Sequence, residues 1–176
     1  MTGLGDARIV GLRSSRMKNT GTLQVTTPSD REILMTRVFD APRHLVFEAF
    51  TRPELLKRWF GPRGHNLTVC EVDFRVGGRW RFVIRDPDGN DMGMRGVYRE
   101  IDAPVRIVHT ESFDGSSDGR EAIVTTVFTQ QGGKTTVRIT VLSPSKAVRD
   151  AVIASGMEHG AAETYDKLAE LLAAMV

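Results

Sequence analysis

Between residues 66 and 142 the sequence repeats one pattern: short segments of alternating apolar and polar residues, each followed by a turn signal. In the segment RWRFVIRD, Trp80, Phe82 and Ile84 point one way, whereas Arg79, Arg81 and Arg85 point the other way, which is the two-residue period of a strand with one buried face. The stretch PDGN is a hairpin turn, and DAP, DGSSDGR and QGGK separate the later segments. About six consecutive strands joined in this way predict an antiparallel meander.

Helical signals flank the meander on both sides. Residues 31–39 (REILMTRVF) predict a strand, and residues 43–60 (RHLVFEAFTRPELLKRWF) predict two short helices that end at Gly61-Pro62. After Ser143-Pro144-Ser145 the apolar spacing becomes helical and predicts one long amphipathic helix to the C-terminus. The sequence therefore predicts an α+β fold, in which a curved antiparallel sheet of about seven strands has its concave face covered by this helix.

Composition limits the class of protein. Residues 1–28 are rich in Gly, Ser, Thr and Arg with no sustained period, so we expect a flexible N-terminal arm there and one domain over residues 29–176. Cys70 is the only cysteine, which precludes an intrachain disulfide and favours a cytoplasmic location. No apolar run approaches the roughly 20 residues of a membrane span. A net charge of +2 does not indicate a nucleic-acid partner.

Few residues suggest catalysis or metal binding. Cys70 lies between apolar residues of a predicted strand, where a buried, inert thiol is the favoured interpretation, and the sequence lacks the G-x-S-x-G motif. The four histidines are scattered, so we expect no metal site and no cofactor. His109 and Glu111 share one face of a predicted strand and are weak candidates for a general acid and base, with solvated polar residues as the alternative.

The arginines of the predicted meander form a further pattern. They lie on the expected outer face of neighbouring strands, with acidic residues interspersed, and are Arg75, Arg79, Arg81, Arg85, Arg95 and Arg99. Such a surface is typical of a solvated sheet face, and the alternative is a docking site for an acidic partner.

Several motifs, taken together, resemble a known family. They are RVFDAPRHLVFEAFTRPELLKRWFGP, VDFRVGGRWRF, GVYREIDAPVRIVHTESF and GMEHGAAETYDKLAELL, and they extend over about residues 30–174. The chain resembles the START-like (SRPBCC, Bet v 1-like) superfamily and, within it, the activator of Hsp90 ATPase homologue 1-like family. The resemblance implies the helix-grip fold, with a cavity between the sheet and the long helix that the two short helices close at one end.

This fold and the aromatic residues together suggest which side chains face the cavity. The candidates for ligand binding are Trp59, Phe60, Trp80, Phe82, Tyr98, His109, Glu111, Phe113, Met157 and Tyr165. We expect Trp59 to guard the cavity opening rather than to fill the interior. Many relatives carry a tryptophan shortly after the GMEHG motif, where this chain has Ala161, so the resemblance implies extra room inside.

Three functions remain open at this point. The first is a non-enzymatic protein that binds a small hydrophobic or aromatic molecule in the cavity. The second, implied by the resemblance, is a protein-interaction module with a chaperone or another protein as its partner. The third is an enzyme of the polyketide cyclase or aromatase type that uses His109 and Glu111. Fold alone does not choose among them.

Overall fold

A computed structural model describes residues 22–116 and 121–176 of the chain. Its eight strands form one antiparallel sheet in the order β1-β2-β8-β7-β6-β5-β4-β3. The strands are β1 (Gln24–Thr26), β2 (Glu32–Phe39), β3 (Asn66–Val72), β4 (Arg79–Arg85), β5 (Asp91–Asp102), β6 (Arg106–Phe113), β7 (Ala122–Gln131) and β8 (Lys134–Leu142). The predicted meander from β3 to β8 is confirmed, because each of these strands pairs with the next.

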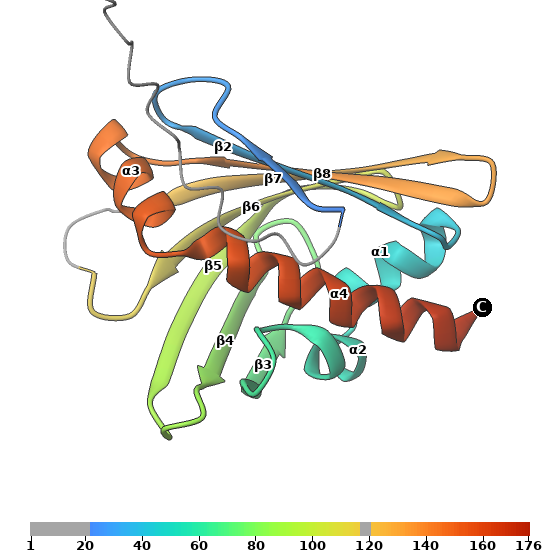
Figure 1. The fold of residues 1–176 in the computed structure, drawn as a ribbon, viewed down its shortest axis with the longest axis horizontal. Helices are drawn as coiled ribbons and strands as arrows, with labels where there is room; N and C mark the ends of the chain where they lie inside the picture. Colours follow the sequence, from blue (N-terminus) through green and yellow to red (C-terminus); the bar gives the residue numbers. More distant parts are fainter. Residues whose placement is uncertain (1–21, 117–120) are drawn as a thin grey trace, which may run out of the picture.

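Four helices accompany the sheet. They are α1 (Arg43–Thr51), α2 (Pro53–Trp59), α3 (Lys146–Ala154) and α4 (Met157–Met175). Figure 1 shows α4 crossing the concave side of the sheet, with α1 and α2 near its C-terminal half and α3 at its N-terminal end. The α+β helix-grip fold is thus confirmed.

The strand count differs slightly from the prediction. The additional strand is β1, which pairs with β2 through the register Gln24 to Thr36. It lies inside the segment predicted as a flexible arm, whose residues 1–21 are outside the described residues. The domain boundary at residue 28 stays a prediction.

The two faces of β4 divide as the alternation predicts. Trp80, Phe82 and Ile84 are buried, whereas Arg79 and Arg85 are exposed on the other face. Register shifts in the pairings of β3 with β4 and of β5 with β6 interrupt the regular ladder, and such irregularities bend a sheet. The curvature turns the apolar faces of β4 to β6 toward the helices.

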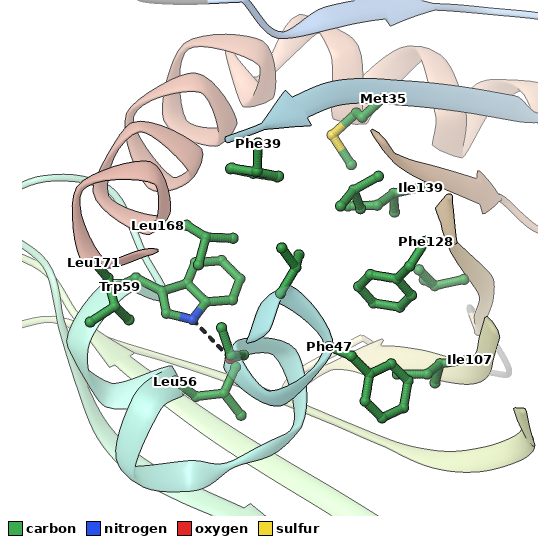
Figure 2. Packing of buried hydrophobic residues seen from close by; sticks show 14 of the residues in the cluster. Met35, Phe39, Phe47, Leu56, Trp59, Ile107, Phe128, Ile139, Leu168 and Leu171 are labelled. Carbon is green, nitrogen blue, oxygen red and sulfur yellow. Dashed lines mark hydrogen bonds between the residues drawn. The ribbon is translucent and has the colours of Figure 1, made fainter. Parts of the chain in front are cut away.

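Trp59 lies in the core, contrary to the expectation that it guards the opening. Its side chain is only 1% exposed, and its indole Nε1 donates a hydrogen bond to the Ala49 carbonyl at 2.9 Å (Figure 2). Phe50 and Tyr165 contact the indole, with ring centroids at 5.0 and 6.1 Å. A large ring with its one polar atom bonded to a buried carbonyl is a core anchor.

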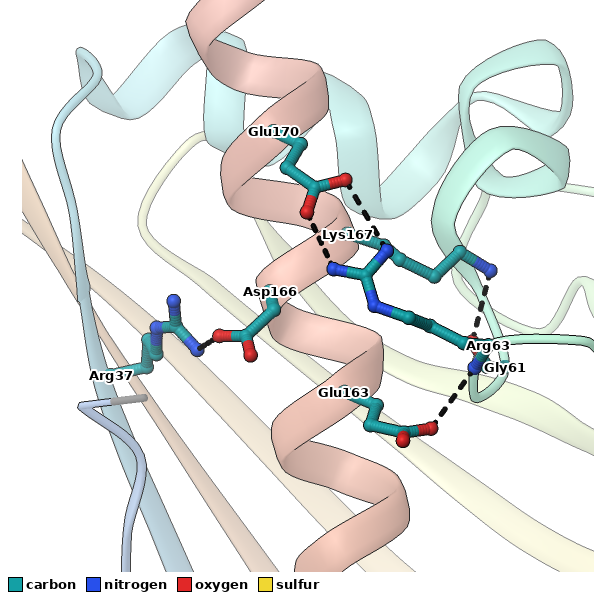
Figure 3. Close-up of polar contacts among 7 residues, drawn as sticks. All are labelled: Arg37, Gly61, Arg63, Glu163, Asp166, Lys167 and Glu170. Atoms are coloured by element: carbon teal, nitrogen blue, oxygen red, sulfur yellow. Dashed lines mark hydrogen bonds and ion pairs between the residues drawn. The ribbon is translucent and has the colours of Figure 1, made fainter. Parts of the chain in front are cut away.

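A set of polar contacts joins α4 to the loop that follows α2. Lys167 donates to the Gly61 carbonyl at 3.1 Å, and the Arg63 backbone amide donates to Glu163 at 3.1 Å. The guanidinium of Arg63 also pairs with Glu170, which lies about one turn beyond Lys167 on α4 (Figure 3). The loop that ends the second short helix is therefore held against the long helix.

The predicted single C-terminal helix is wrong, because the chain breaks between α3 and α4. Gly156 adopts a left-handed backbone conformation with φ at 89°, and its amide bonds the Ile153 carbonyl. A glycine with positive φ is a common way to end a helix, since other residues pay a steric cost there. The break lets α3 leave the direction of α4 and cover a different part of the sheet.

Two glycine substitutions test this break. Gly156→Ala should lower the free energy of unfolding by about 1 kcal/mol, because alanine is strained at positive φ. Gly160→Ala, inside α4, should be neutral or stabilising by up to about 1 kcal/mol, because alanine favours a helix interior. Its new Cβ would meet Pro62 Cγ at 3.4 Å, which is an ordinary contact. Urea denaturation followed by circular dichroism measures both; equal effects would argue against the break.

Candidate functional site

A pocket of about 960 Å³ lies between the concave face of the sheet and the helices. Side chains from β2, from β4 to β8 and from all four helices line it, and most of them are apolar. The lining includes every residue predicted to bind a ligand: Trp59, Phe60, Trp80, Phe82, Tyr98, His109, Glu111, Phe113, Met157 and Tyr165. That these side chains bind a ligand stays a prediction.

Strand β6 places His109 and Glu111 in the pocket. The strand pairs His109 with Tyr98 of β5 and Glu111 with Ala122 of β7. Because side chains alternate along a strand, His109 and Glu111 face the pocket with Ile107, whereas Val108 and Thr110 face the other side. The two polar groups thus lie on one wall, two residues apart.

The imidazole of His109 lies among aromatic rings. Its ring centroid is 5.4 Å from that of Trp80 and 6.2 Å from that of Tyr98, both in edge-on geometry. Burial lowers the pKa of His109 to about 4, because the charged imidazolium is poorly solvated there. His109 is therefore neutral at physiological pH.

The carboxyl of Glu111 lies in the pocket without a compensating charge among the described residues. Within the described residues it has no hydrogen bond or ion pair, and neither lysine nor arginine lines the pocket around it. Burial raises the pKa of Glu111 to about 7. Burial, with a smaller effect of the Glu111 charge, also raises the pKa of the Tyr165 hydroxyl. The negative charge of Glu111 is therefore removed by a proton or compensated by a group that enters the pocket.

The arrangement has the ingredients of acid–base chemistry. The pKa of His109 is lowered and the pKa of Glu111 is raised. Two groups whose pKa values are shifted in opposite directions can supply a base and an acid in one site. The catalytic assignment of His109 and Glu111 nevertheless stays a prediction, because the same shifts follow from burial in any apolar pocket.

Aromatic side chains make a continuous wall beside this pair. Phe60 contacts Phe82, and Phe82 contacts Trp80, each with ring centroids at 4.9 Å. Toward solvent the wall ends at Phe113 and Met92, which are 38% and 47% exposed. Phe60 and Phe113 thus lie nearer the surface than the buried Trp59.

Sequence reasoning missed part of the lining. Val124 and Thr126 of β7 and Ile139 and Val141 of β8 face the pocket, and the two-residue alternation, if continued through these strands, would have identified them. The lining residues of α3 gave no such signal, because the break at Gly156 was not foreseen. Ala161 packs against the core and does not belong to the lining.

Other predicted features have an ordinary structural role. On the outer face, Arg81 and Arg95 both pair with Asp114, as expected of a solvated sheet surface. Burial raises the pKa of the Cys70 thiol to about 11, so this cysteine is a poor nucleophile. Within residues 22–116 and 121–176 there is no cluster of acidic, histidine and cysteine side chains suited to a metal ion. In the same residues no helix is long and apolar enough to cross a membrane.

The curved sheet, the long helix across it and the pocket between them define a START-like protein of the helix-grip type. The chain belongs to the family described as "Activator of Hsp90 ATPase homolog 1-like protein", whose sequence profile matches residues 40–173. Among curated proteins there is no significant match to the chain.

Solved structures support this assignment. A protein from Rhodobacter sphaeroides is 32% identical, with a TM-score of 0.81 over 86% of this chain and 98% of that one. A Mycobacterium smegmatis protein at 23% identity, with 87% of this chain and 98% of that one aligned, shows the same fold with a TM-score of 0.78. An Hsp90 activator from Plasmodium falciparum is 26% identical, with a TM-score of 0.52 over 64% of this chain and 72% of that one.

The raised pKa of Glu111 predicts a pH-dependent effect of Glu111→Gln. The folded protein binds the carboxyl proton more tightly than the unfolded chain, so the stability from this group is lost as pH rises from 4.5 through about 7. Glutamine does not ionise, so the variant should differ little from the wild type at pH 4.5. At pH 8 it should be more stable by on the order of 2 kcal/mol.

Urea denaturation at a series of pH values measures this difference. Glu71→Gln is the matched control, since Glu71 is exposed on β3, outside the pocket. Its effect should be small and nearly independent of pH. A constant difference between Glu111→Gln and the wild type across the series would show that Glu111 is solvated in the folded protein.

Proposed function

We propose that the protein is a non-enzymatic binding protein that holds a small, mostly apolar molecule in the pocket. The observation that carries the proposal is the pair His109 and Glu111, two half-buried, pocket-facing polar side chains without a hydrogen-bond partner among the described residues. Polar groups in protein interiors are nearly always hydrogen-bonded. An uncompensated pair in an apolar pocket therefore marks a place for the polar groups of a ligand.

The dimensions of the pocket agree with this function. Pockets for small molecules usually measure about 300–1,000 Å³ and combine apolar walls with a few polar groups. A volume of about 960 Å³ is at the upper end of that range. Binding would derive mainly from burial of apolar ligand surface, at roughly 25 cal/mol per Å² before the cost of association.

A tryptophan at the pocket mouth tests the proposal. Ala151 of α3 lines the pocket and is exposed, so Ala151→Trp should obstruct the pocket without disturbing the core. Ala154→Trp is the matched control, because Ala154 is exposed on the same helix and outside the lining. The uncharged fluorescent dye prodan should bind the wild type and the control alike.

We expect Ala151→Trp to weaken dye binding at least tenfold, measured by fluorescence titration. Native mass spectrometry of freshly purified protein would then identify a natural ligand that remains bound. If the dye binds all three proteins equally well, or none of them, the pocket is not a ligand site and the proposal fails.

Family membership favours a second candidate, a protein-interaction module with an Hsp90-type chaperone as its partner. The similarity to the Plasmodium falciparum Hsp90 activator supports it. On the outer face of β4, Arg79 and Arg85 are exposed, and although Arg85 pairs with Asp91, the two side chains are candidate contacts for an acidic partner. This interaction would not use the pocket, so the two functions are separable.

Charge reversal on the outer face of β4, compared with charge reversal on α2, tests the docking surface. Arg79→Glu with Arg85→Glu should abolish co-purification with an Hsp90-type chaperone from cell extract. Lys57→Glu with Arg58→Glu on α2 changes the net charge equally on a different, exposed surface and should leave co-purification intact. If both double variants retain the chaperone, or both lose it, the outer face of β4 is not a specific docking site.

A further inference from the structure

We infer that the pocket selects a compact aromatic molecule that carries a protonated amine, whose ammonium group pairs with the Glu111 carboxylate, and that it rejects carboxylate ligands. The inference rests on the proposed binding function and names the chemical class of the ligand. Three features of the described residues support it: the charge of the lining, the space around Glu111 and the aromatic rings nearby.

The first feature is the charge of the lining. Glu111 is its one carboxylate, and it contains no lysine or arginine that could neutralise an anion. The other titratable groups that face the pocket are His109 on the same strand, Tyr98 on β5 and Tyr165 on α4. Burial keeps all three neutral near pH 8, because it lowers the pKa of the imidazole and raises the pKa of both phenols. The described lining residues therefore offer one negative charge and no positive one.

The second feature is the space beside Glu111. Its partner across the β6–β7 pairing is Ala122, whose methyl group leaves the carboxyl open on that side. On the other side, Arg95 of β5 pairs with Ser112, so the register brings the next residue, Gly96, opposite Glu111. Neither neighbour offers a side-chain donor. Among the residues that the structure describes, the carboxyl is thus left without a partner while it faces a pocket large enough for one.

The third feature is the aromatic surroundings. The indole Nε1 of Trp80 lies beside Gly96, since a Cβ at that position would meet it at 2.5 Å, and this N–H has no hydrogen-bond partner among the described residues. Tyr165 lies close enough to Glu111 for the carboxylate charge to affect the pKa of its hydroxyl. Aromatic rings attract ammonium groups through their negative faces, and a desolvated carboxylate adds a direct ion pair. The walls that accommodate an aromatic ligand therefore also favour a cation.

Burial already raises the pKa of the half-buried Glu111 carboxyl, so part of the cost of removing water from the carboxylate belongs to folding and not to ligand binding. An incoming ammonium restores a counter-charge to it, whereas an alcohol of the same shape supplies only a neutral hydrogen bond. An incoming carboxylate would place two negative charges together in a medium of low dielectric constant. Ligand charge should therefore order the affinities as amine, then alcohol, then carboxylate.

A matched series of ligands tests this order. The series is 2-(aminomethyl)naphthalene, 2-(hydroxymethyl)naphthalene and 2-naphthoate, which share one ring system and differ in charge. Isothermal titration calorimetry at pH 8, where Glu111 is mostly ionised, should show the amine binding at least about tenfold more tightly than the alcohol. Naphthoate should bind at least about tenfold more weakly than the alcohol.

Two variants complete the experiment. Glu111→Gln should bring the amine and alcohol within about twofold of each other while it preserves alcohol binding, which also shows that the variant is folded. Glu71→Gln should retain the wild-type preference. If the alcohol binds and the amine binds no better, the inference is overturned and the proposed function stands. If no member of the series binds, both fail for aromatic ligands of this size.

Discussion

The concave face of one curved sheet must be removed from water, and the chain has a single long helix with which to cover it. The nineteen residues of α4 extend about 28 Å, which covers the sheet near α1 and α2 but not the whole face. Over that part, side chains such as Trp59, Leu168 and Leu171 fill the interior (Figure 2). Beyond that part the short helix α3 also lies opposite the sheet, and the pocket lies between the sheet and the four helices.

The position of α4 depends on polar contacts as well as on apolar packing. The Arg37 guanidinium on β2 bonds the Asp166 carboxylate at 2.6 Å, and both side chains are largely buried (Figure 3). The opposite flank of α4 holds the loop after α2 through Lys167 and Gly61. Pairs of this kind specify a geometry more than they add stability. The helix is fixed on both flanks, so the pocket has a rigid side.

The parts of the fold that follow from local patterns were predictable from the sequence. Two-residue alternation identified the buried face of Trp80 in β4 and placed His109 and Glu111 of β6 on one common face, because a strand admits only two side-chain directions, but it left open whether that face is concave. The break at Gly156 was not predictable in the same way, since a glycine is compatible with both a helix interior and a left-handed cap. The direction of Trp59 also depends on tertiary contacts, because it and Phe60 are adjacent in the chain and face different ways. The short strand β1 carries too few residues to show a period.

The helix α3 is attached to the rest of the protein by fewer buried side chains than α4. Of its residues, which the structure describes in full, only Arg149 is buried, and this guanidinium bonds the Ser29 carbonyl at 2.6 Å. The exposed side chains of α3, among them Ala147 and Ala151, can therefore change with little effect on folding, yet both of these line the pocket. Part of the pocket wall is thus built from a segment that contributes little to stability. A lineage with this architecture could reshape that part of the wall through substitutions in α3, without passing through unstable intermediates.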